Sequence, residues 1–389
     1  MADRYRYISG DSHLEVNSNR WVHRVAEKYR TVAPKVVTMP DGGDGWTVEG
    51  LPPRENYSDL YGGKGRDVWR PYGQTYEATA GTGPGEQRVK EQEQDGIDGE
   101  VLFPGQVSGP KFWRLIKDDE AYKAVVRGYN DWLAEEYCAV DPHRLIGLGV
   151  LPWCSVKDAI AEMEHIAELG MKGVLLTGFP NGTGHPAPED DEFWAAALSM
   201  DMPVAIHVDV DRTGERAGPV FVYPKEMGDV SRGLVEQVAH FSPTRGSGGI
   251  GAVQMVLSGL FDRFPKLRIL LAENQIGWVP FFLQTADVRY ERHIAWTEEL
   301  LGFEPLSRPP SAYILDHFLW GFQFDRVGVE LRHHLGVHNL VWGSDFPHQE
   351  SDWPNSLGVI ERNFAGVPEE ERYKMVAGNV IDFFSLTDG

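Results

Sequence analysis

The sequence contains very little cysteine: two residues, Cys138 and Cys154, among 389. Two cysteines are too few for the disulfide framework of a small secreted domain, and their spacing matches no zinc ribbon. No run of about 18 uncharged apolar residues occurs, and the N-terminal MADRYRYISGDSH lacks the apolar segment of a signal peptide. We therefore expect a cytoplasmic protein that does not associate with membranes.

Positive charge is also scarce. The chain has 37 Lys and Arg against 58 Asp and Glu, which gives a net charge of −21 at pH 7. Such a surface repels phosphate backbones, so we expect no nucleic-acid partner. Hydrophobic residues make up 42% of the chain and aromatic residues 11%, which is enough for a substantial core. These values indicate a globular protein that acts on small molecules.

Apolar runs of strand length alternate with longer stretches of helical period. This alternation is typical of βα units, and strands buried on both faces of a parallel sheet should be continuously apolar. Eight such units close more naturally into a barrel than into an open sheet. The sequence therefore predicts an α/β fold, a (β/α)8 TIM barrel that forms a single domain over residues 1–389. The expected strands are Tyr5–Gly10, Glu100–Phe103, Leu145–Leu151, Gly173–Leu176, Pro203–His207, Leu267–Ala272, Phe318–Phe322 and Asn339–Trp342.

One segment, from about Pro40 to Gln87, interrupts this alternation with the glycine-rich runs GGDG, GGKG and GTGPG. We interpret residues 40–87 as a long insertion after the first strand. Active sites of such barrels lie where the strands run into the following loops, so this insertion is expected to form a lid over the site. Among the helices, Ser155–Leu169 is predicted to have Ser155 as its N-cap and Gly170 as its C-cap.

Three polar clusters follow or end predicted strands. They occur in ISGDSHLE of the first strand, PVAIHVD of the fifth and LVWGSDFPH of the eighth. In the first cluster the acidic and imidazole side chains are two residues apart, so an extended backbone points them in one direction. Imidazole with carboxylate suits zinc, manganese or iron rather than calcium. The candidate ligands are Asp11, His13, Glu15, His207 and Asp345.

Each cluster also has a simpler interpretation. Asp-Ser-His is compatible with a capping turn, His207 with a hydrogen-bonded core histidine, and Ser-Asp-Phe-Pro with an ordinary turn. Their joint occurrence on the first, fifth and eighth strands favours a metal site, because these strand ends share one mouth of a barrel.

These motifs together resemble the amidohydrolase superfamily. The chain is similar to the amidohydrolase-related branch that includes aminocarboxymuconate-semialdehyde, γ-resorcylate and 5-carboxyvanillate decarboxylases. The resemblance runs over most of the chain from the second strand onward, through DPHRLIGLGVLPW, FDRFPKLRILLAEN followed by GW, GSDFPH and AGNVIDFF. It implies a distorted (β/α)8 barrel with one divalent metal, zinc in the first place and manganese as the alternative.

Carried onto this chain, the resemblance implies that Asp11, His13, His207 and Asp345 hold the metal. The common first-strand motif is His-x-His, with an acidic residue replacing the first histidine in some decarboxylases. Here Asp11-x-His13-x-Glu15 permits two registers. We favour Asp11 with His13, and Glu15 remains the alternative ligand or a residue that orients one.

Acid–base and substrate residues are less sharply indicated. Many family members carry a histidine on the sixth strand that acts in proton transfer, where this chain has Glu273. A partly dry carboxylate there could act as acid or base, although a salt bridge to an arginine is the alternative. His348 is the other acid–base candidate, and Asp345 would act on metal-activated water. Three tryptophans near strand ends could line an aromatic pocket or belong to the core: Trp278, Trp320 and Trp342.

Three functions are compatible with these residues. The leading hypothesis is a metal-dependent lyase that removes carboxylate from an aromatic or unsaturated acid without redox chemistry. The alternative is a hydrolase of an ester, amide or C–C bond that uses metal-activated water. A barrel without metal that serves as a binding protein is the third. The resemblance also implies a homo-oligomer, with a dimer as the expected form.

Overall fold

The computed structural model describes residues 5–55, 60–68, 70, 72–77, 79–105, 109–210, 223–225, 227 and 248–386. The chain divides into two compact units. Unit 1 comprises Met1–Pro152, Ala161–Leu175 and Trp342–Gly389, and unit 2 comprises Trp153–Ile160 and Leu176–Val341.

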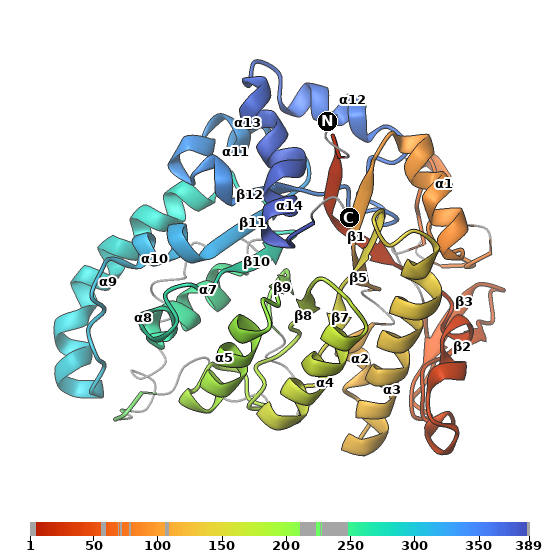
Figure 1. Cartoon of the computed structure of the whole chain (residues 1–389), viewed down its shortest axis with the longest axis horizontal. Coiled ribbons are helices and arrows are strands. Elements are labelled where there is room, and N and C mark those ends of the chain that lie inside the picture. Colours follow the sequence, from red (N-terminus) through yellow and green to blue (C-terminus); the bar gives the residue numbers. More distant parts are fainter. Residues whose placement is uncertain are drawn as a thin grey trace. The chain divides into compact units, whose positions relative to one another are not determined.

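Unit 1 contains a parallel sheet in which β1 (Ile8–Leu14), β5 (Gly99–Pro104) and β6 (Leu145–Gly147) are neighbours in that order. Strands β1 and β5 run side by side in Figure 1, and Ile8 pairs with Gly99. All residues of these three strands are buried, including the polar residues of β1. A second parallel pair joins β7 (Gly149–Val150) to β8 (Val174–Leu175).

Residues 35–55 of unit 1 form a small antiparallel sheet of β2 (Lys35–Thr38), β3 (Asp44–Thr47) and β4 (Arg54–Glu55). The predicted insertion therefore contains regular structure. Trp46 of β3 packs its ring 4.8 Å from that of Phe112. The helices of unit 1 are α1 (Gly85–Asp95), α2 (Pro110–Trp113), α3 (Asp119–Trp132), α12 (Ser356–Asn363), α13 (Glu369–Tyr373) and α14 (Asn379–Phe383).

Unit 2 contains three parallel strands, β9 (Val204–His207), β10 (Ile269–Ala272) and β11 (Phe318–Phe322), which lie side by side in Figure 1. The carboxyl ends of β9 and β10 are level, because Ala272 pairs with His207. The described helices of unit 2 are α5 (Asp191–Ser199), α7 (Gly248–Leu257), α8 (Leu260–Arg263), α9 (Val279–Leu301), α10 (Pro310–His317) and α11 (Arg326–Glu330).

Two further elements lie at the boundaries between the units along the chain. Strand β12 (Leu340–Trp342) ends on the first residue of the last segment of unit 1. Helix α4 (Val156–Glu168) confirms the predicted helix. Ser155 Oγ accepts a hydrogen bond from the amide of Asp158 at 3.1 Å, and Gly170 has φ +78° after the last turn.

All eight predicted strand positions carry a strand, but two boundaries were wrong. The first strand was expected at Tyr5–Gly10 and lies at Ile8–Leu14, so Asp11 and His13 belong to the strand itself. The run Leu145–Leu151 is broken at Leu148, because the amide of Leu148 donates to Leu102 and that of Gly149 to Gly173. This segment therefore changes its partner strand halfway along.

The α/β class with parallel sheets is confirmed. The hydrogen-bonded strands of the described residues do not close a ring, so the barrel, its single-domain organisation and the lid stay predictions. None of the described helices combines the length and the apolar composition needed to cross a bilayer.

Asp190 of unit 2 is a buried carboxylate that should make stability depend on pH. It accepts hydrogen bonds from the amides of Asn181 (2.8 Å) and Ala187 (3.0 Å), yet burial raises its pKa from 3.8 to about 6. Between pH 4 and 6 the folded protein keeps a proton that the unfolded chain releases. The contribution of Asp190 to the free energy of unfolding therefore falls as pH rises through this window, by about 3 kcal/mol in total.

We expect Asp190→Asn to remove this dependence. The difference between the unfolding free energies of variant and wild type, from urea titrations, should shift by about 3 kcal/mol in favour of the variant between pH 4 and 7. The exposed Glu192→Gln change provides a surface-charge control. Parallel stability curves for wild type and Asp190→Asn would contradict the prediction.

Candidate metal centre

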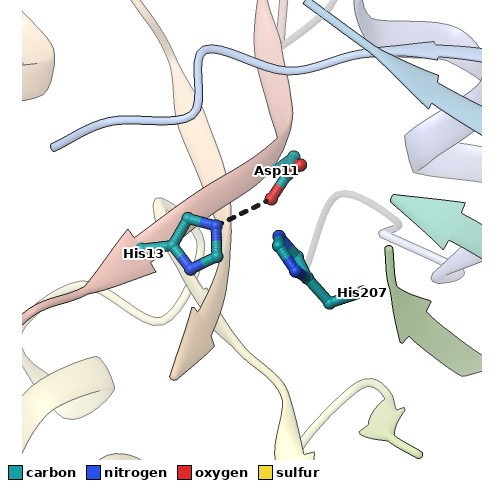
Figure 2. Close-up of side chains that lie close together, drawn as sticks. All are labelled: Asp11, His13 and His207. Atoms are coloured by element: carbon teal, nitrogen blue, oxygen red, sulfur yellow. Dashed lines mark ion pairs between the residues drawn. The ribbon is translucent and has the colours of Figure 1, made fainter. Parts of the chain in front are cut away.

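Strand β1 carries two of the predicted ligands. Its pairing with β5 shifts register between Ser9 and Ser12, a bulge that changes the direction of the side chains next to it. Figure 2 shows Asp11 and His13 on this strand, with a ring nitrogen of His13 facing the Asp11 carboxylate. Both side chains are buried.

The loop after β12 lies directly against this strand within unit 1. The amide of Asp345 donates to the carbonyl of Asp11 at 2.9 Å, and the amide of His13 donates to the carbonyl of Phe346 at 2.7 Å. Asp345 has φ +56°, a left-handed conformation that is uncommon for a residue other than glycine. The backbone therefore fixes the aspartate of the eighth-strand motif beside the first-strand motif.

His13 has the geometry of a metal-binding histidine. Its Nδ1–H donates to the carbonyl of Pro104 (3.2 Å), so the neutral form of the ring carries its lone pair on Nε2. Nε2 lies 3.4 Å from Oδ1 of Asp11 and 3.3 Å from Oδ1 of Asp345. Two carboxylate oxygens thus lie within 3.4 Å of one imidazole nitrogen, and such donors suit zinc or manganese.

His348 and Glu15 extend the cluster. Nδ1 of His348 lies 2.8 Å from Oδ1 of Asp345, and Nε2 lies 3.0 Å from Oε1 of Glu15. The ring stacks on that of His13 at a centroid distance of 4.0 Å. The potential ligand atoms of His13, Glu15 and His348 lie within 4.8 Å of one another. Glu15 therefore belongs to the same cluster as the two histidines.

The charges of this cluster shift two pKa values. Burial and the nearby His348 oppose ionisation of His13, but the carboxylates of Asp11 and Asp345 outweigh both and raise its pKa above its ordinary value. Burial also opposes ionisation of Asp345, yet His348 and His13 hold the pKa of this carboxyl well below its usual range. The carboxylate of Asp345 is therefore ionised and able to bind a cation.

The other two predicted site residues lie together in unit 2. His207 ends β9, and Glu273 follows β10 with φ +54°. Nε2 of His207 lies 3.3 Å from Oε2 of Glu273, so these two side chains form an ion pair. The side-chain amide of Asn274 donates to the carbonyls of Val208 (3.1 Å) and Ala272 (2.8 Å), which ties the ends of β9 and β10 together.

Comparison with known protein families shows to which family the chain belongs. The family model described as Amidohydrolase matches residues 93–386, about three quarters of the sequence. The chain belongs to the amidohydrolase family. This confirms the resemblance drawn from the motifs and makes the protein an enzyme of the amidohydrolase superfamily. The matched region includes His207, Glu273, Asp345 and His348, whereas the Asp11-x-His13 motif precedes it.

Two curated relatives of this amidohydrolase are decarboxylases. It is 26% identical over 257 residues to decarboxylase orsB of Emericella nidulans, which covers 64% of this chain and 73% of the relative. It is 26% identical over 294 residues to γ-resorcylate decarboxylase of Rhodococcus jostii, covering 70% of this chain and 80% of the relative.

Two solved structures share the fold. An amidohydrolase from Mycobacterium avium subsp. paratuberculosis superposes with a TM-score of 0.68 at 17% identity, over 98% of this chain and 99% of that one. The 5-carboxyvanillate decarboxylase of Novosphingobium aromaticivorans, complexed with manganese and 4-hydroxy-3-methoxy-5-nitrobenzoic acid, gives 0.64 at 15% identity, over 99% and 97%. Similarity over nearly the whole chain supports the predicted fold family.

The three tryptophans predicted for the substrate pocket differ in exposure. Trp320 and Trp342 are fully buried, and Trp278 is partly exposed. Nε1 of Trp278 donates to the carbonyl of Asn274 at 2.9 Å, and its ring meets that of Trp320 edge-on at 5.7 Å. Their role as a pocket wall stays a prediction.

Sequence reasoning missed a group of serines that links the two segments carrying the candidate metal ligands Asp11 and Asp345. Ser9 Oγ accepts a hydrogen bond from the amide of Ser344 (2.8 Å), and Ser12 Oγ donates to Ser9 Oγ (2.9 Å). All three serines are buried. The SGDS and GSD motifs contain them, but nothing in a sequence shows that residues 335 positions apart share a hydrogen bond.

Gly343 permits the close approach of its own segment to Asp11. A Cβ atom there would lie 2.5 Å from Cβ and 2.9 Å from the backbone nitrogen of Asp11. We expect Gly343→Ala to separate the segments, weakening Mn²⁺ binding at least about tenfold and lowering the free energy of unfolding by about 1–3 kcal/mol. Manganese titration and urea unfolding would measure the two effects.

Gly99 on β5 offers a matched control, since its added Cβ would meet its nearest atom, the carbonyl oxygen of Arg144, at an ordinary 3.5 Å. Gly99→Ala should bind Mn²⁺ as the wild type does. Equal affinities for Gly343→Ala and Gly99→Ala would show that the close approach to Asp11 is unimportant.

Proposed function

We propose that this enzyme catalyses nonoxidative decarboxylation of an aromatic hydroxycarboxylic acid with one divalent metal. Family membership and the two decarboxylase relatives support the reaction class. The observation that carries the metal is the position of His13 Nε2, 3.3–3.4 Å from two buried carboxylate oxygens, while Nδ1 donates to the backbone.

In this proposal Asp11, His13 and Asp345 hold the metal from unit 1. His207 stays the predicted fourth ligand. Glu15 is assigned to His348 and not to the metal, because its carboxylate lies 3.0 Å from Nε2 of that ring. Manganese in the related 5-carboxyvanillate decarboxylase makes it the first metal to test, with zinc as the second.

A bound divalent metal supplies Lewis acidity and a fixed point for the substrate carboxylate and an adjacent hydroxyl group. The protein residues keep that point in place, because Asp345 and His13 are hydrogen-bonded through their backbones to each other's segments. Breaking the C–C bond leaves its electron pair on the ring carbon, carbon dioxide departs, and a proton takes its place. Glu273 and His348 are the two candidates for the acid that provides this proton.

The insertion is proposed to cover this site. Within unit 1, a Cβ atom on Gly62 would lie 3.0 Å from Cε2 of Phe346, and one on Gly81 would lie 2.4 Å from Cβ of Pro347. Residues 62 and 81 therefore pack against the two residues that follow Asp345. A segment in this position can exclude water from the reacting carbon.

The test uses protein purified without added metal. Its metal content is measured by mass spectrometry, and after reconstitution with Mn²⁺ or Zn²⁺ carbon dioxide release is followed with a panel of hydroxybenzoates. Unsubstituted benzoate is the matched control, since it lacks the second group for the metal. We expect about one metal ion per chain. Carbon dioxide should be released from at least one hydroxybenzoate and not from benzoate.

Other outcomes favour the alternatives. Hydrolysis of esters or amides without carbon dioxide release would support the hydrolase. A protein that binds neither metal would support a binding role and contradict the proposed enzyme mechanism. The mass of the particle in solution would test the proposed homodimer.

A further inference from the structure

Arg88 of α1 is a buried arginine that no motif indicates and that lies outside the segment matched by the family model. Its side chain is 1% exposed. Nε donates to Oε2 of Glu100 at 2.6 Å and Nη2 donates to Oε1 at 3.1 Å, a bidentate pair. Gln92 also donates to Oε2 of Glu100, at 2.7 Å. Glu100, on β5, thus holds the guanidinium in one orientation.

The other side of the guanidinium reaches both segments of the metal cluster. Nη1 donates to the carbonyl of His13 at 3.1 Å, and Nη2 donates to the carbonyl of Phe346 at 3.1 Å. The carbonyl of Phe346 also accepts from the amide of His13, and the guanidinium carbon lies 4.4 Å from the centroid of the Phe346 ring. The Arg88 side chain therefore links His13 on β1 to Phe346, the residue that follows Asp345.

We propose that Arg88 is a positioning residue that sets the separation of His13 and Asp345 and thereby the affinity for the metal. This inference rests on the proposed function, because it assigns these two residues to the metal. The planar fork of arginine is needed, since its three nitrogens reach one carboxylate and two carbonyls in fixed directions. A lysine ammonium would keep the charge beside Glu100 but could not reproduce this fork.

A purely structural role is the competing explanation, and Arg127 provides the comparison. Arg127 also pairs with a buried glutamate of unit 1, since its Nε donates to Oε2 of Glu162 at 2.8 Å. Within the described part of the chain, its guanidinium bonds Glu162 through Nε and Nη2 and does not bond the segments of His13 and Asp345. Arg127→Lys therefore makes the same chemical change to an arginine–glutamate pair away from the cluster.

The experiment compares Arg88→Lys, Arg127→Lys and wild type by two readouts. Mn²⁺ affinity is measured by titration with detection of free Mn²⁺. Hydrogen exchange in metal-free protein is measured for peptides that contain the amides of His13 and Asp345, which donate across the two segments. We expect Arg88→Lys to bind Mn²⁺ at least about tenfold more weakly and to lose protection in both peptides, while Arg127→Lys matches the wild type.

The two readouts separate the failure of this inference from that of the proposed function. Unchanged protection and affinity in Arg88→Lys would overturn the positioning role, even if its melting temperature fell. Equal losses in Arg88→Lys and Arg127→Lys would also overturn it, because any weakened pair would then suffice. If the wild type bound no metal, the proposed function would fail, and the exchange rates alone would decide whether Arg88 positions the segments.

Discussion

Replacing His13 with alanine is expected to abolish Mn²⁺ binding and to lower kcat/KM for decarboxylation by about 1,000-fold or more. The loss should exceed the 10–100-fold typical of residues that only orient ligands, because Nε2 of His13 faces both carboxylates. Metal content by mass spectrometry and initial rates of carbon dioxide release would measure the two losses. The folded state is checked by circular dichroism.

His317 supplies a matched control within the same protein. It is buried like His13, and its Nδ1 lies 2.7 Å from the carbonyl of Leu267. Its ring stacks on Phe261 at 4.2 Å, and burial lowers its pKa, whereas the carboxylates beside His13 raise the pKa there. His317→Ala should therefore lose stability but keep one metal per chain. Full metal content in His13→Ala would show that the site lies elsewhere.

The sequence predicted where the strands lie better than where they end. Apolar runs placed the eight strands, because strands buried on both faces carry apolar residues almost without interruption. The first strand was placed too early for the same reason. The apolar run ends at Gly10, yet the strand continues to Leu14 with Asp11 and His13 buried in it. Hydrophobicity stops predicting a strand where its polar side chains form a site.

The motifs indicated candidate ligands, but not which side chains lie next to one another. Asp11, His13 and Asp345 were predicted together and lie together in unit 1, as do His207 and Glu273 in unit 2. The bond from Arg88 to the carbonyl of Phe346 joins residues 258 positions apart. The acceptor is a backbone carbonyl, which every residue type has. The bond therefore could not be predicted from the type of residue at position 346.

Removal of the Arg88 charge should have the largest effect on stability. Arg88→Met is expected to lower the free energy of unfolding of the metal-free protein by about 3–5 kcal/mol, because Glu100 remains buried with no cation. Glu100 is 2% exposed in its side chain, so water cannot replace the guanidinium. Arg127→Met should cost about 1 kcal/mol, since the Arg127 side chain is 42% exposed and Asn130 still donates to Glu162. Urea unfolding would measure each variant without stabilisation by bound metal.

The double variant Arg88→Met with Glu100→Leu separates the buried charge from the two carbonyls. If the unpaired carboxylate causes the loss, removing it should recover most of the stability, because a buried ion pair can often be replaced by apolar residues at little cost. The carbonyls of His13 and Phe346 would still lack the guanidinium, so metal affinity should stay low in the double variant. Recovered stability without recovered affinity would mean that the ion pair itself adds little to the fold and that Arg88 matters chiefly for the metal cluster. A double variant as unstable as Arg88→Met would instead place the cost in the two carbonyls.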